Sequence, residues 1–157
     1  MPQLAVNTPI GPLAIAEEDG AIVSIDWGWP AASVETTLLV RACRQIEEYF
    51  AGRRTSFDLP LAPPGTPFQR WVWQELTAIP YGQTRSYGEL AAALGTAPRA
   101  LGGACGRNPI PVVIPCHRVL AADRRLGGYS GLDGIETKRF LLTLEGVLSP
   151  AETENDR

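Results

Sequence analysis

The spacing of hydrophobic residues is strand-like at the start of the chain and helix-like after it. Residues 3–27 alternate short apolar runs with turn-forming residues at 7–12 and 18–20. The apolar runs are Leu4-Ala5-Val6, Leu13-Ala14-Ile15 and Ala21-Ile22-Val23-Ser24-Ile25. This alternation predicts an antiparallel meander.

The next segment has the period of an amphipathic helix. Leu39, Cys43, Ile46 and Phe50 fall on one helical face, and Gly52 is placed to end the helix. Cys43 is therefore expected in the core. Residues 53–60 predict one further strand, and the cluster Pro63-Pro64-Gly65 predicts a linker.

These elements predict an α/β protein in two parts. Residues 1–62 are expected to form a small N-terminal antiparallel sheet-plus-helix domain. It is expected to pack on a mainly helical C-terminal domain, residues 63–149, that contains a helix-turn-helix. Residues 150–157 form an acidic tail that we expect to be disordered.

The second part begins with a helix that carries its own start signal. Thr66-Pro67-Phe68-Gln69 combines a capping residue, a proline at the first helical position and a glutamine at the third. The apolar stripe that follows comprises Phe68, Trp71, Val72, Leu76 and Ile79. Trp71 and Trp73 could stack on nucleic-acid bases, but we favour core packing for both.

Two short helices follow. Ser86-Tyr87-Gly88-Glu89 predicts a helix that runs through Leu94 and ends at Gly95, and Arg99 opens a second helix to about Gly106. Such a pair is typical of a helix-turn-helix, although the lengths alone favour a helical hairpin with no nucleic-acid partner. The second helix is rich in glycine, and each interior glycine costs about 1 kcal/mol relative to alanine. Small side chains there would let the helix approach another surface closely.

A last helix is predicted before the tail. Asp133 and Glu136 form its start signal, and Phe140, Leu141 and Leu144 are expected to pack inward.

Composition sets the broad class of the protein. With 157 residues and 45% apolar residues, the chain can bury a core without disulfide staples. The apolar runs are only a few residues long, so we expect neither a signal peptide nor a membrane span. Three cysteines without a framework spacing suit a reducing compartment, which predicts a cytoplasmic protein.

Charge is distributed unevenly along the chain, whose net charge is −3. Residues 1–60 hold eight acidic and four basic side chains, giving −4, and residues 151–157 hold three and one, giving −2. Residues 61–150 hold six and nine, giving +3. From Arg99 to Arg125 five arginines face the single acid Asp123. This part of the chain has the positive charge that a DNA-binding surface needs.

The candidate chemistry lies in Pro115-Cys116-His117-Arg118-Val119. The apolar residues 110–114 before it predict a short buried strand that delivers the thiol to the edge of a core. His117 could act as a base toward the thiol, and Arg118 could add a positive field that favours the thiolate. A buried cysteine beside a histidine is, taken alone, more often a packing feature. Val113 stands where a haem-attachment motif needs a second cysteine, and one histidine with three scattered cysteines does not supply the ligand set of a zinc site.

The wider motif resembles the O6-alkylguanine-DNA alkyltransferase family. It comprises the segment from Arg99 through Asn108 to Val119, the loop Gly127-Gly128-Tyr129-Ser130-Gly131, and Leu141-Leu142-Thr143-Leu144-Glu145-Gly146. The similarity spans roughly residues 66 to 147. It implies single-turnover transfer of the alkyl group of O6-alkylguanine, and of O4-alkylthymine, in DNA to a cysteine.

The resemblance also assigns roles. It implies that Cys116 is the acceptor, that His117 is its base through a water, and that Glu145 orients the imidazole. It implies that Asn108 bridges the turns beside the thiol and that Tyr87 supplies a proton or hydrogen bond to the departing guanine. A soft thiol suits displacement at a saturated carbon better than a hydroxyl does.

The resemblance implies two further sets of residues. DNA contacts fall at Ser86, Arg99, Ala100, Gly102 and Gly103, with the glycine-rich helix in the minor groove and Arg99 filling the stack vacated by a flipped nucleotide. The base pocket is lined by Val119, Gly127, Tyr129, Ser130 and Gly131, and the carbonyls of Cys116 and Val119 read the guanine amino group. The resemblance implies a monomer that needs no cofactor or metal and has double-stranded DNA as its partner.

Two alternatives from other classes remain. One is a non-catalytic lesion-binding protein on the same scaffold, but proteins of that kind lack the cysteine. The other is a Cys-His hydrolase or a redox sensor, which leaves Arg99 and the glycine-rich helix unexplained. A redox sensor also needs a resolving thiol, and Cys105 lies too deep on the expected inner face of that helix for this role.

Overall fold

The computed structural model describes residues 1–127 and 134–149. The chain divides into two compact units, Met1–Pro64 and Gly65–Arg157, and each is described by itself. The tail that we expect to be disordered lies outside the described residues.

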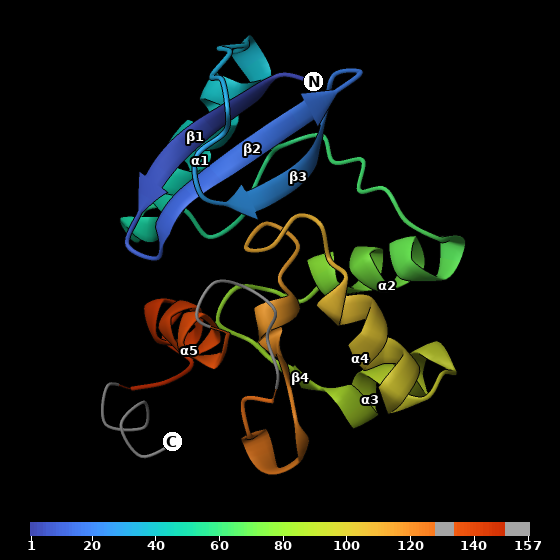
Figure 1. Cartoon of the computed structure of the whole chain (residues 1–157). Coiled ribbons are helices and arrows are strands. Elements are labelled where there is room, and N and C mark those ends of the chain that lie inside the picture. The colour runs from blue at the N-terminus through green and yellow to red at the C-terminus, as the bar shows by residue number, and fades with distance from the viewer. Residues whose placement is uncertain (128–133, 150–157) are drawn as a thin grey trace. The chain divides into compact units, whose positions relative to one another are not determined.

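The first unit is a three-stranded antiparallel sheet with one helix (Figure 1). Strands β1 (Gln3–Thr8), β2 (Gly11–Glu18) and β3 (Ala21–Trp27) lie in chain order. Helix α1 (Thr37–Phe50) packs on one face of the sheet, and Leu13, Ile15, Leu39 and Ile46 are fully buried between them. The predicted meander and helix are confirmed, and Cys43 is buried as expected.

The strand predicted over residues 53–60 is wrong. Contact with the sheet is limited to one parallel bridge between Leu61 and Ile22, in which the Ile22 N–H donates to the Pro60 carbonyl and the Ala62 N–H donates to the Ile22 carbonyl, both at 2.8 Å. The side chain of Gln45 on α1 takes the hydrogen bonds that a ladder would need: its Nε2 donates to the Asp58 carbonyl and its Oε1 accepts from the Asp58 N–H, at 3.2 and 2.9 Å. A glutamine on the neighbouring helix therefore takes both backbone hydrogen bonds of Asp58 in place of a partner strand.

The second unit begins with the expected cap. Helix α2 (Pro67–Thr77) has the full capping box of Thr66 and Gln69. The prediction for its two tryptophans is half wrong: the Trp73 side chain is buried, but Trp71 is 42% exposed. The Nε1 of Trp73 donates to the Ala104 carbonyl at 2.8 Å, which joins α2 to a later helix. A Cβ on Gly65 would lie 2.6 Å from the Trp73 ring, so only glycine fits at the end of the linker.

The predicted pair of short helices is present. Strand β4 (Arg85–Ser86) leads into α3 (Tyr87–Leu94), whose cap Ser86 accepts from the Glu89 N–H at 3.0 Å. Gly95 ends α3 with a left-handed φ of 68°. Helix α4 (Pro98–Gly106) begins at Pro98, one residue before the predicted start, and packs against both α2 and α3.

The predicted strand over residues 110–114 is a turn. Four of these residues are buried as expected, but the Ile114 N–H donates to the Ile110 carbonyl at 2.9 Å and Val112 has a φ of 73°. Pro111 has no N–H to give to a sheet ladder. The chain continues through the 3₁₀ helix η1 (Cys116–Arg118), strand β5 (Val119–Leu120) and the 3₁₀ turn η2 (Ala122–Arg124).

Helix α5 (Ile135–Leu144) closes the described part of the unit. Its N-cap is Gly134, and Asp133 lies outside the described residues. Leu141 is buried as predicted, but Phe140 is 39% exposed and Leu142 takes the inward position instead. Leu142 packs with Leu120, Leu126 and Leu148 in one apolar cluster. None of the helices in the described part of the chain is long and apolar enough to span a membrane.

Candidate active site

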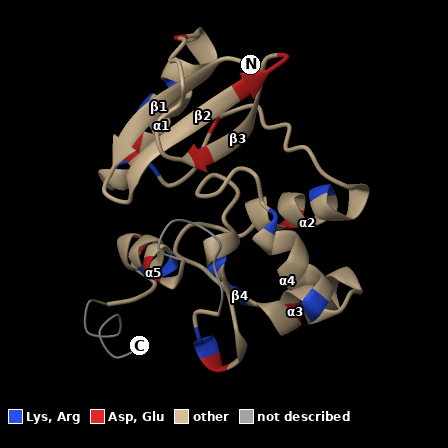
Figure 2. Ribbon diagram, viewed as in Figure 1, with Lys and Arg blue, Asp and Glu red and all other residues tan. Residues whose placement is uncertain are grey.

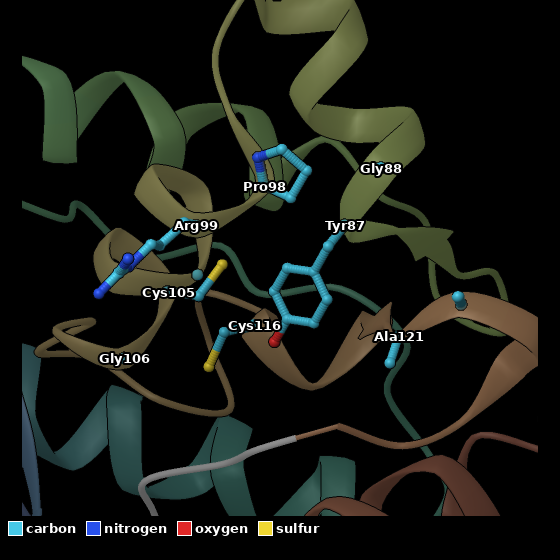
Figure 3. Close-up of a pocket in the computed structure, with 10 residues that line it drawn as sticks. Tyr87, Gly88, Pro98, Arg99, Cys105, Gly106, Cys116 and Ala121 are labelled. Carbon is cyan, nitrogen blue, oxygen red and sulfur yellow. The ribbon is translucent and has the colours of Figure 1, made fainter.

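A pocket of about 770 Å³ lies in the second unit, and Cys116 is on its wall (Figure 3). Its lining comes from α3, α4 and the segment that follows the Cys-His pair. The lining residues are Tyr87, Gly88, Pro98, Arg99, Gly102, Cys105, Gly106, Cys116, Ala121 and Ala122.

A short parallel strand pair brings the distant parts of this wall together. Arg85 pairs with Val119 and Ser86 with Leu120, so β4 and β5 lie side by side. Tyr87 directly follows β4 and Cys116 shortly precedes β5. The phenol and the thiol therefore reach the same pocket although 29 positions separate 87 from 116 in the sequence.

Asn108 holds the turn that carries the thiol. Its Nδ2 lies 2.8 Å from the Ile114 carbonyl and 3.3 Å from Cys116 Sγ, and its Oδ1 accepts from the Ile110 N–H at 2.9 Å. One amide thus joins both ends of the 110–114 turn and donates to the sulfur. The Cys116 side chain is buried within this frame and only 6% of the residue is exposed.

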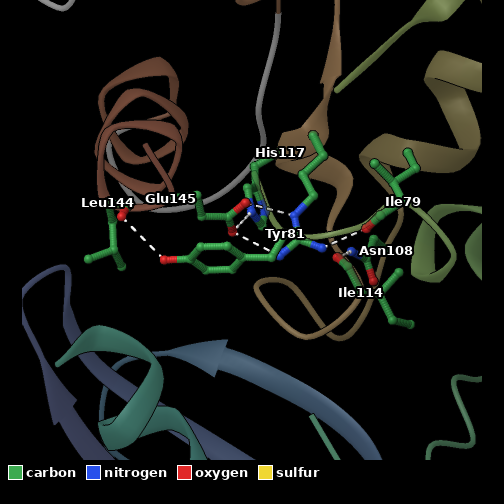
Figure 4. Close-up of polar contacts among 8 residues, drawn as sticks. Ile79, Tyr81, Asn108, Ile114, His117, Leu144 and Glu145 are labelled. Carbon is green, nitrogen blue, oxygen red and sulfur yellow. Dashed lines mark hydrogen bonds and ion pairs between the residues drawn. The ribbon is translucent and has the colours of Figure 1, made fainter. Parts of the chain in front are cut away.

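Behind the thiol lies a buried cluster of His117, Glu145 and Arg118 (Figure 4). His117 Nε2 is 2.7 Å from Glu145 Oε2. Arg118 approaches the same carboxylate with two nitrogens, at 2.8 and 3.0 Å, and donates to the Ile79 carbonyl at 2.7 Å. The predicted role of Arg118 as a field on the thiol does not match this geometry, because its guanidinium is bound to Glu145.

The cluster fixes the protonation of the histidine. Burial opposes ionisation of Glu145, but hydrogen bonds and charge from His117 and Arg118 outweigh it and lower the pKa of Glu145 from 4.5 to about 2. Burial lowers the pKa of His117 below 6.5, assisted by Arg118 and Lys138 and opposed by Glu145. A neutral imidazole facing a carboxylate must donate from Nε2–H, so Nδ1 carries the lone pair. Among the described residues this buried Nδ1 has no hydrogen-bond partner.

Lys138 on α5 is a buried charge beside the pocket. Its Nζ donates to the Val119 carbonyl at 2.7 Å and lies 5.6 Å from the centre of the Tyr87 ring. Burial lowers the pKa of Lys138 from 10.5 to about 8. Burial, with the nearby thiols Cys105 and Cys116, raises the pKa of Tyr87, so its phenol stays a hydrogen-bond donor.

The environments of the other two cysteines, Cys43 and Cys105, disfavour the thiolate form. Burial is the main cause that raises the pKa of Cys43 to about 11, and the charge of Glu47 adds to it. Burial is also the main cause that raises the pKa of Cys105 to about 12, and the nearby Cys116 adds to it. Both remain protonated near neutral pH, and a protonated thiol is a weak nucleophile.

The surface of α4 beside the pocket is open. A Cβ added to Gly102, Gly103 or Gly106 would meet no atom within 4 Å, so packing inside the protein does not require glycine at these positions. Arg99 and Ala100 are exposed, and Arg99 lines the pocket. The glycines leave a smooth helical face that a second molecule can approach.

The remaining predicted residues lie in different places. Ser86 caps α3, and Val119 is buried with its carbonyl bound to Lys138, away from the pocket lining. Gly127, with a φ of 71°, approaches Ala121 and the Tyr87 ring, where a Cβ would lie 3.5 Å from each. Tyr129, Ser130 and Gly131 lie outside the described residues.

Comparison with known proteins identifies the family of the chain. Residues 67–147 match the family described as 6-O-methylguanine DNA methyltransferase, DNA binding domain, and residues 4–63 match its ribonuclease-like domain. The chain belongs to the 6-O-methylguanine DNA methyltransferase family. It is 45% identical over 154 residues to the constitutive methylated-DNA–protein-cysteine methyltransferase of Bacillus subtilis, covering 90% of this chain and 93% of the relative.

Further relatives of the same family agree in sequence and in fold. The methylated-DNA–protein-cysteine methyltransferase of Methanosarcina barkeri is 45% identical over 150 residues, covering 89% of this chain and 94% of the relative. The crystal structure of Mycobacterium tuberculosis OGT in complex with DNA superposes with a TM-score of 0.84 at 38% identity, covering 99% of this chain and 100% of that one. The family similarity inferred from the motif and the α/β fold class are thereby confirmed.

Sequence reasoning misses one residue of the site in this methyltransferase-family chain and gives a second residue another role. Lys138 has no role in the sequence-based prediction, and Arg118 has a different one. A signal for Lys138 is available, because on a helix it shares a face with Leu141, Leu142 and Glu145. A lysine at a core position indicates a buried partner. No comparable signal exists for the partners of Arg118, because Ile79 and Glu145 are distant in sequence.

Proposed function

We propose that this protein repairs DNA by direct reversal and that Cys116 accepts the alkyl group from O6 of guanine. The single observation that carries the proposal is the position of the Cys116 thiol. It lies on the wall of a pocket of about 770 Å³, which has room for a purine base. The thiol is bound by Asn108 and is adjacent in sequence to a buried histidine whose Nε2 faces Glu145. A helix with an open glycine face borders the same pocket.

The transfer is a single in-line displacement. A bond forms from Cys116 Sγ to the alkyl carbon as the bond from that carbon to O6 breaks. His117 Nδ1, through a water, takes the thiol proton, and the imidazolium is stabilised by the ionised Glu145. The departing guanine takes up one proton, so the overall reaction is neutral in protons.

Tyr87 assists the leaving group in this proposal. Its raised pKa keeps the phenol protonated, and the phenol lies on the pocket wall where it can donate to the departing base. In this proposal Gly127, Tyr129, Ser130 and Gly131 complete the base pocket, and the Cys116 carbonyl reads the guanine amino group. The Val119 carbonyl already accepts from Lys138, so it would join this readout only through its second lone pair.

The base reaches the pocket by leaving the duplex, because O6 is hydrogen-bonded inside the stack. Helix α4 lies in the minor groove, where Ala100, Gly102 and Gly103 permit close approach and Arg99 fills the vacated position. Ser86, at the start of α3, contacts the DNA backbone. The partner is double-stranded DNA that carries O6-alkylguanine, and O4-alkylthymine is a second substrate.

The thioether product is not readily hydrolysed, so each molecule acts once. We propose a monomer that uses no cofactor or metal. None of its three cysteines, all in the described part of the chain, forms a disulfide, which suits the reducing cytoplasm.

Intact mass measured before and after incubation with an oligonucleotide that carries one O6-methylguanine tests the proposal. The protein should gain the mass of one CH₂ on Cys116, the oligonucleotide should lose it, and product should never exceed protein. Cys116→Ser should transfer nothing, whereas Cys43→Ser and Cys105→Ser, the matched controls, should retain transfer. Several products per protein molecule, or a methyl group on another residue, would exclude the proposed reaction.

A further inference from the structure

Residues 121–125 form a tight hairpin that the transfer reaction does not use. The Ala121 N–H donates to the Arg125 carbonyl at 2.7 Å, and the Arg125 N–H donates to the Ala122 carbonyl at 3.3 Å. At the tip, Asp123 and Arg124 have φ values of 58° and 62°. Two consecutive left-handed residues make a primed turn, the kind that asparagine and glycine favour.

Arg124 is an unfavourable residue for this position. Glycine enters the left-handed region readily because it lacks a Cβ, and asparagine does so because its short amide bonds locally. Arginine has neither advantage. Non-glycine residues held in such conformations gather at functional sites, which makes the hairpin a candidate for a function of its own.

The arginines of the hairpin are also exposed and unpaired. Within residues 1–127 and 134–149, neither Arg124 nor Arg125 takes part in an ion pair or a side-chain hydrogen bond. Arg118 in the same unit is instead buried against Glu145. Figure 2 shows basic and acidic residues together on this hairpin, and the acidic one is Asp123 at the tip. The local charge of residues 123–125 is therefore +1.

The hairpin continues directly from the pocket wall. Ala121 and Ala122 line the pocket, and Figure 3 shows Ala121 across from Arg99, with Tyr87 and Cys116 between them. A nucleotide whose base enters this pocket must leave its phosphates outside, because a phosphodiester loses too much hydration energy inside. The residues just beyond Ala122 are then beside the backbone of that nucleotide.

We propose that Arg124 and Arg125 bind the phosphates that flank the nucleotide inserted into the pocket. This inference rests on the proposed function and adds a binding site for the DNA backbone to it. Guanidinium groups donate two parallel hydrogen bonds to phosphate oxygens, and both arginines lack competing acceptors among the described residues. Together with Arg99 on the opposite side, they place positive charge on both sides of the pocket mouth.

The salt dependence of DNA binding tests this site. Binding of the Cys116→Ser protein to a duplex with one O6-methylguanine is measured from low to moderate salt in three backgrounds. The first is Arg124→Gly/Arg125→Ala, where glycine also relieves the turn. The second is Arg124→Lys/Arg125→Lys, which keeps the charge. The third is Arg44→Ala/Arg53→Ala, which removes two exposed arginines of the first unit and changes the net charge equally.

The slope of log affinity against log salt should become shallower by about 1 for each phosphate that no longer has an arginine, hence by about 2 in the first variant. A change of about 1 supports binding to one phosphate. The single variants Arg124→Gly and Arg125→Ala then show which of the two arginines binds it. The lysine variant and the first-unit control should keep the slope, and Asp123→Asn should raise affinity. An unchanged slope in the first variant, or an equal change in the first-unit control, would overturn the inference.

Transfer chemistry separates this inference from the proposed function. The Arg124→Gly/Arg125→Ala change, made with Cys116 intact, should leave the reaction with free O6-methylguanine base unchanged, because that substrate has no phosphate. If the unaltered protein transfers no alkyl group from duplex DNA, the proposed function fails. If it transfers normally and the slopes are all alike, only the phosphate site fails.

Discussion

Glu145 is a carboxylate with no access to bulk water whose charge depends on two neighbours. It accepts from His117 and, through two nitrogens, from Arg118, and all three residues are buried. Removing one member of such a cluster leaves an uncompensated buried charge. Glu145 and Arg118, which set the protonation of His117, therefore also join the end of α5 to η1.

Arg118→Met should lower the free energy of unfolding by about 3–5 kcal/mol, because Glu145 would keep its charge but lose both hydrogen bonds from the Arg118 guanidinium. Arg54→Met is the matched control, since Arg54 pairs with Glu48 in a partly exposed bridge that contributes at most about 1 kcal/mol. Urea unfolding of both variants measures the difference. Equal decreases would mean that the buried bridge is no stronger than the surface one.

At the scale of elements, α4 is a helix whose glycines are not explained by packing. Gly102, Gly103 and Gly106 face open space, whereas Gly95 at the end of α3 is needed for its positive φ. The stability of α4 comes from its buried side, where Leu101 and Ala104 pack and Trp73 bonds to the helix. The exposed side is then free to serve as a binding surface.

Gly103→Ala should stabilise the protein by about 0.5–1 kcal/mol and weaken binding to duplex DNA, because the new Cβ improves helix propensity and enlarges the binding face. Thermal unfolding and duplex affinity measure the two effects. In the control Gly95→Ala, the left-handed φ should make the substitution destabilising. Stabilisation by Gly103→Ala without weaker binding would show that this face does not contact DNA.

Elements whose start and end signals are local can be predicted from the sequence. Segments whose backbone hydrogen bonds go to groups distant in the sequence cannot. The caps Thr66, Ser86 and Gly95 lie within one turn of the helices they bound, so the sequence contains the whole interaction. Residues 53–60 and 110–114 look like strands, but Gln45 takes the backbone hydrogen bonds of Asp58 in the first segment, and the second forms a turn at Val112. Trp71 and Phe140 face outward although their spacing places them on the apolar side of their helices. The orientation of each ring depends on neighbours that the periodicity of the sequence does not identify.

The site divides in the same way. The Cys116-His117 pair is contiguous and its motif is specific, so the sequence alone identifies it. The contacts of Arg118 with Ile79 and Glu145, and of Lys138 with Val119, join segments far apart in the chain. Predicting them requires knowing that β4 pairs with β5 and that α5 packs behind η1.

For the whole molecule, the perturbed groups define a pH window of stability. The folded state keeps His117 neutral below its usual pKa of 6.5, so the unfolded chain binds more protons as pH falls below 6.5, and stability decreases. Glu145, with a pKa of about 2 against 4.5, adds a second decrease below 4.5. Cys43 and Cys105, with pKa values of about 11 and 12, keep their protons where the unfolded thiols lose theirs, so stability falls as pH rises above 9.

Lys138 opposes the alkaline decrease, because its pKa of about 8 makes the folded state release a proton that the unfolded chain retains up to 10.5. We therefore expect urea unfolding to give a maximum between about pH 7 and 9 and a decline on each side. His117→Gln should flatten the decline from about pH 7 to 5, and Cys43→Ala should reduce the alkaline one. A His117→Gln protein that loses stability as steeply as the parent in that acid range would contradict the assignment.

The hydrogen bond from Trp73 Nε1 to the Ala104 carbonyl gives the protein an optical reporter of its own. Indole emission depends on the polarity and hydrogen bonding of the ring, and this ring is buried against α4 while Trp29 and Trp71 are exposed. Replacing Trp27, Trp29 and Trp71 by phenylalanine would leave Trp73 as the single tryptophan, which senses α4 from inside and can be excited selectively over the tyrosines. Its spectrum and its resistance to a soluble quencher would report in real time whether the helix shifts when duplex DNA arrives, without any attached dye.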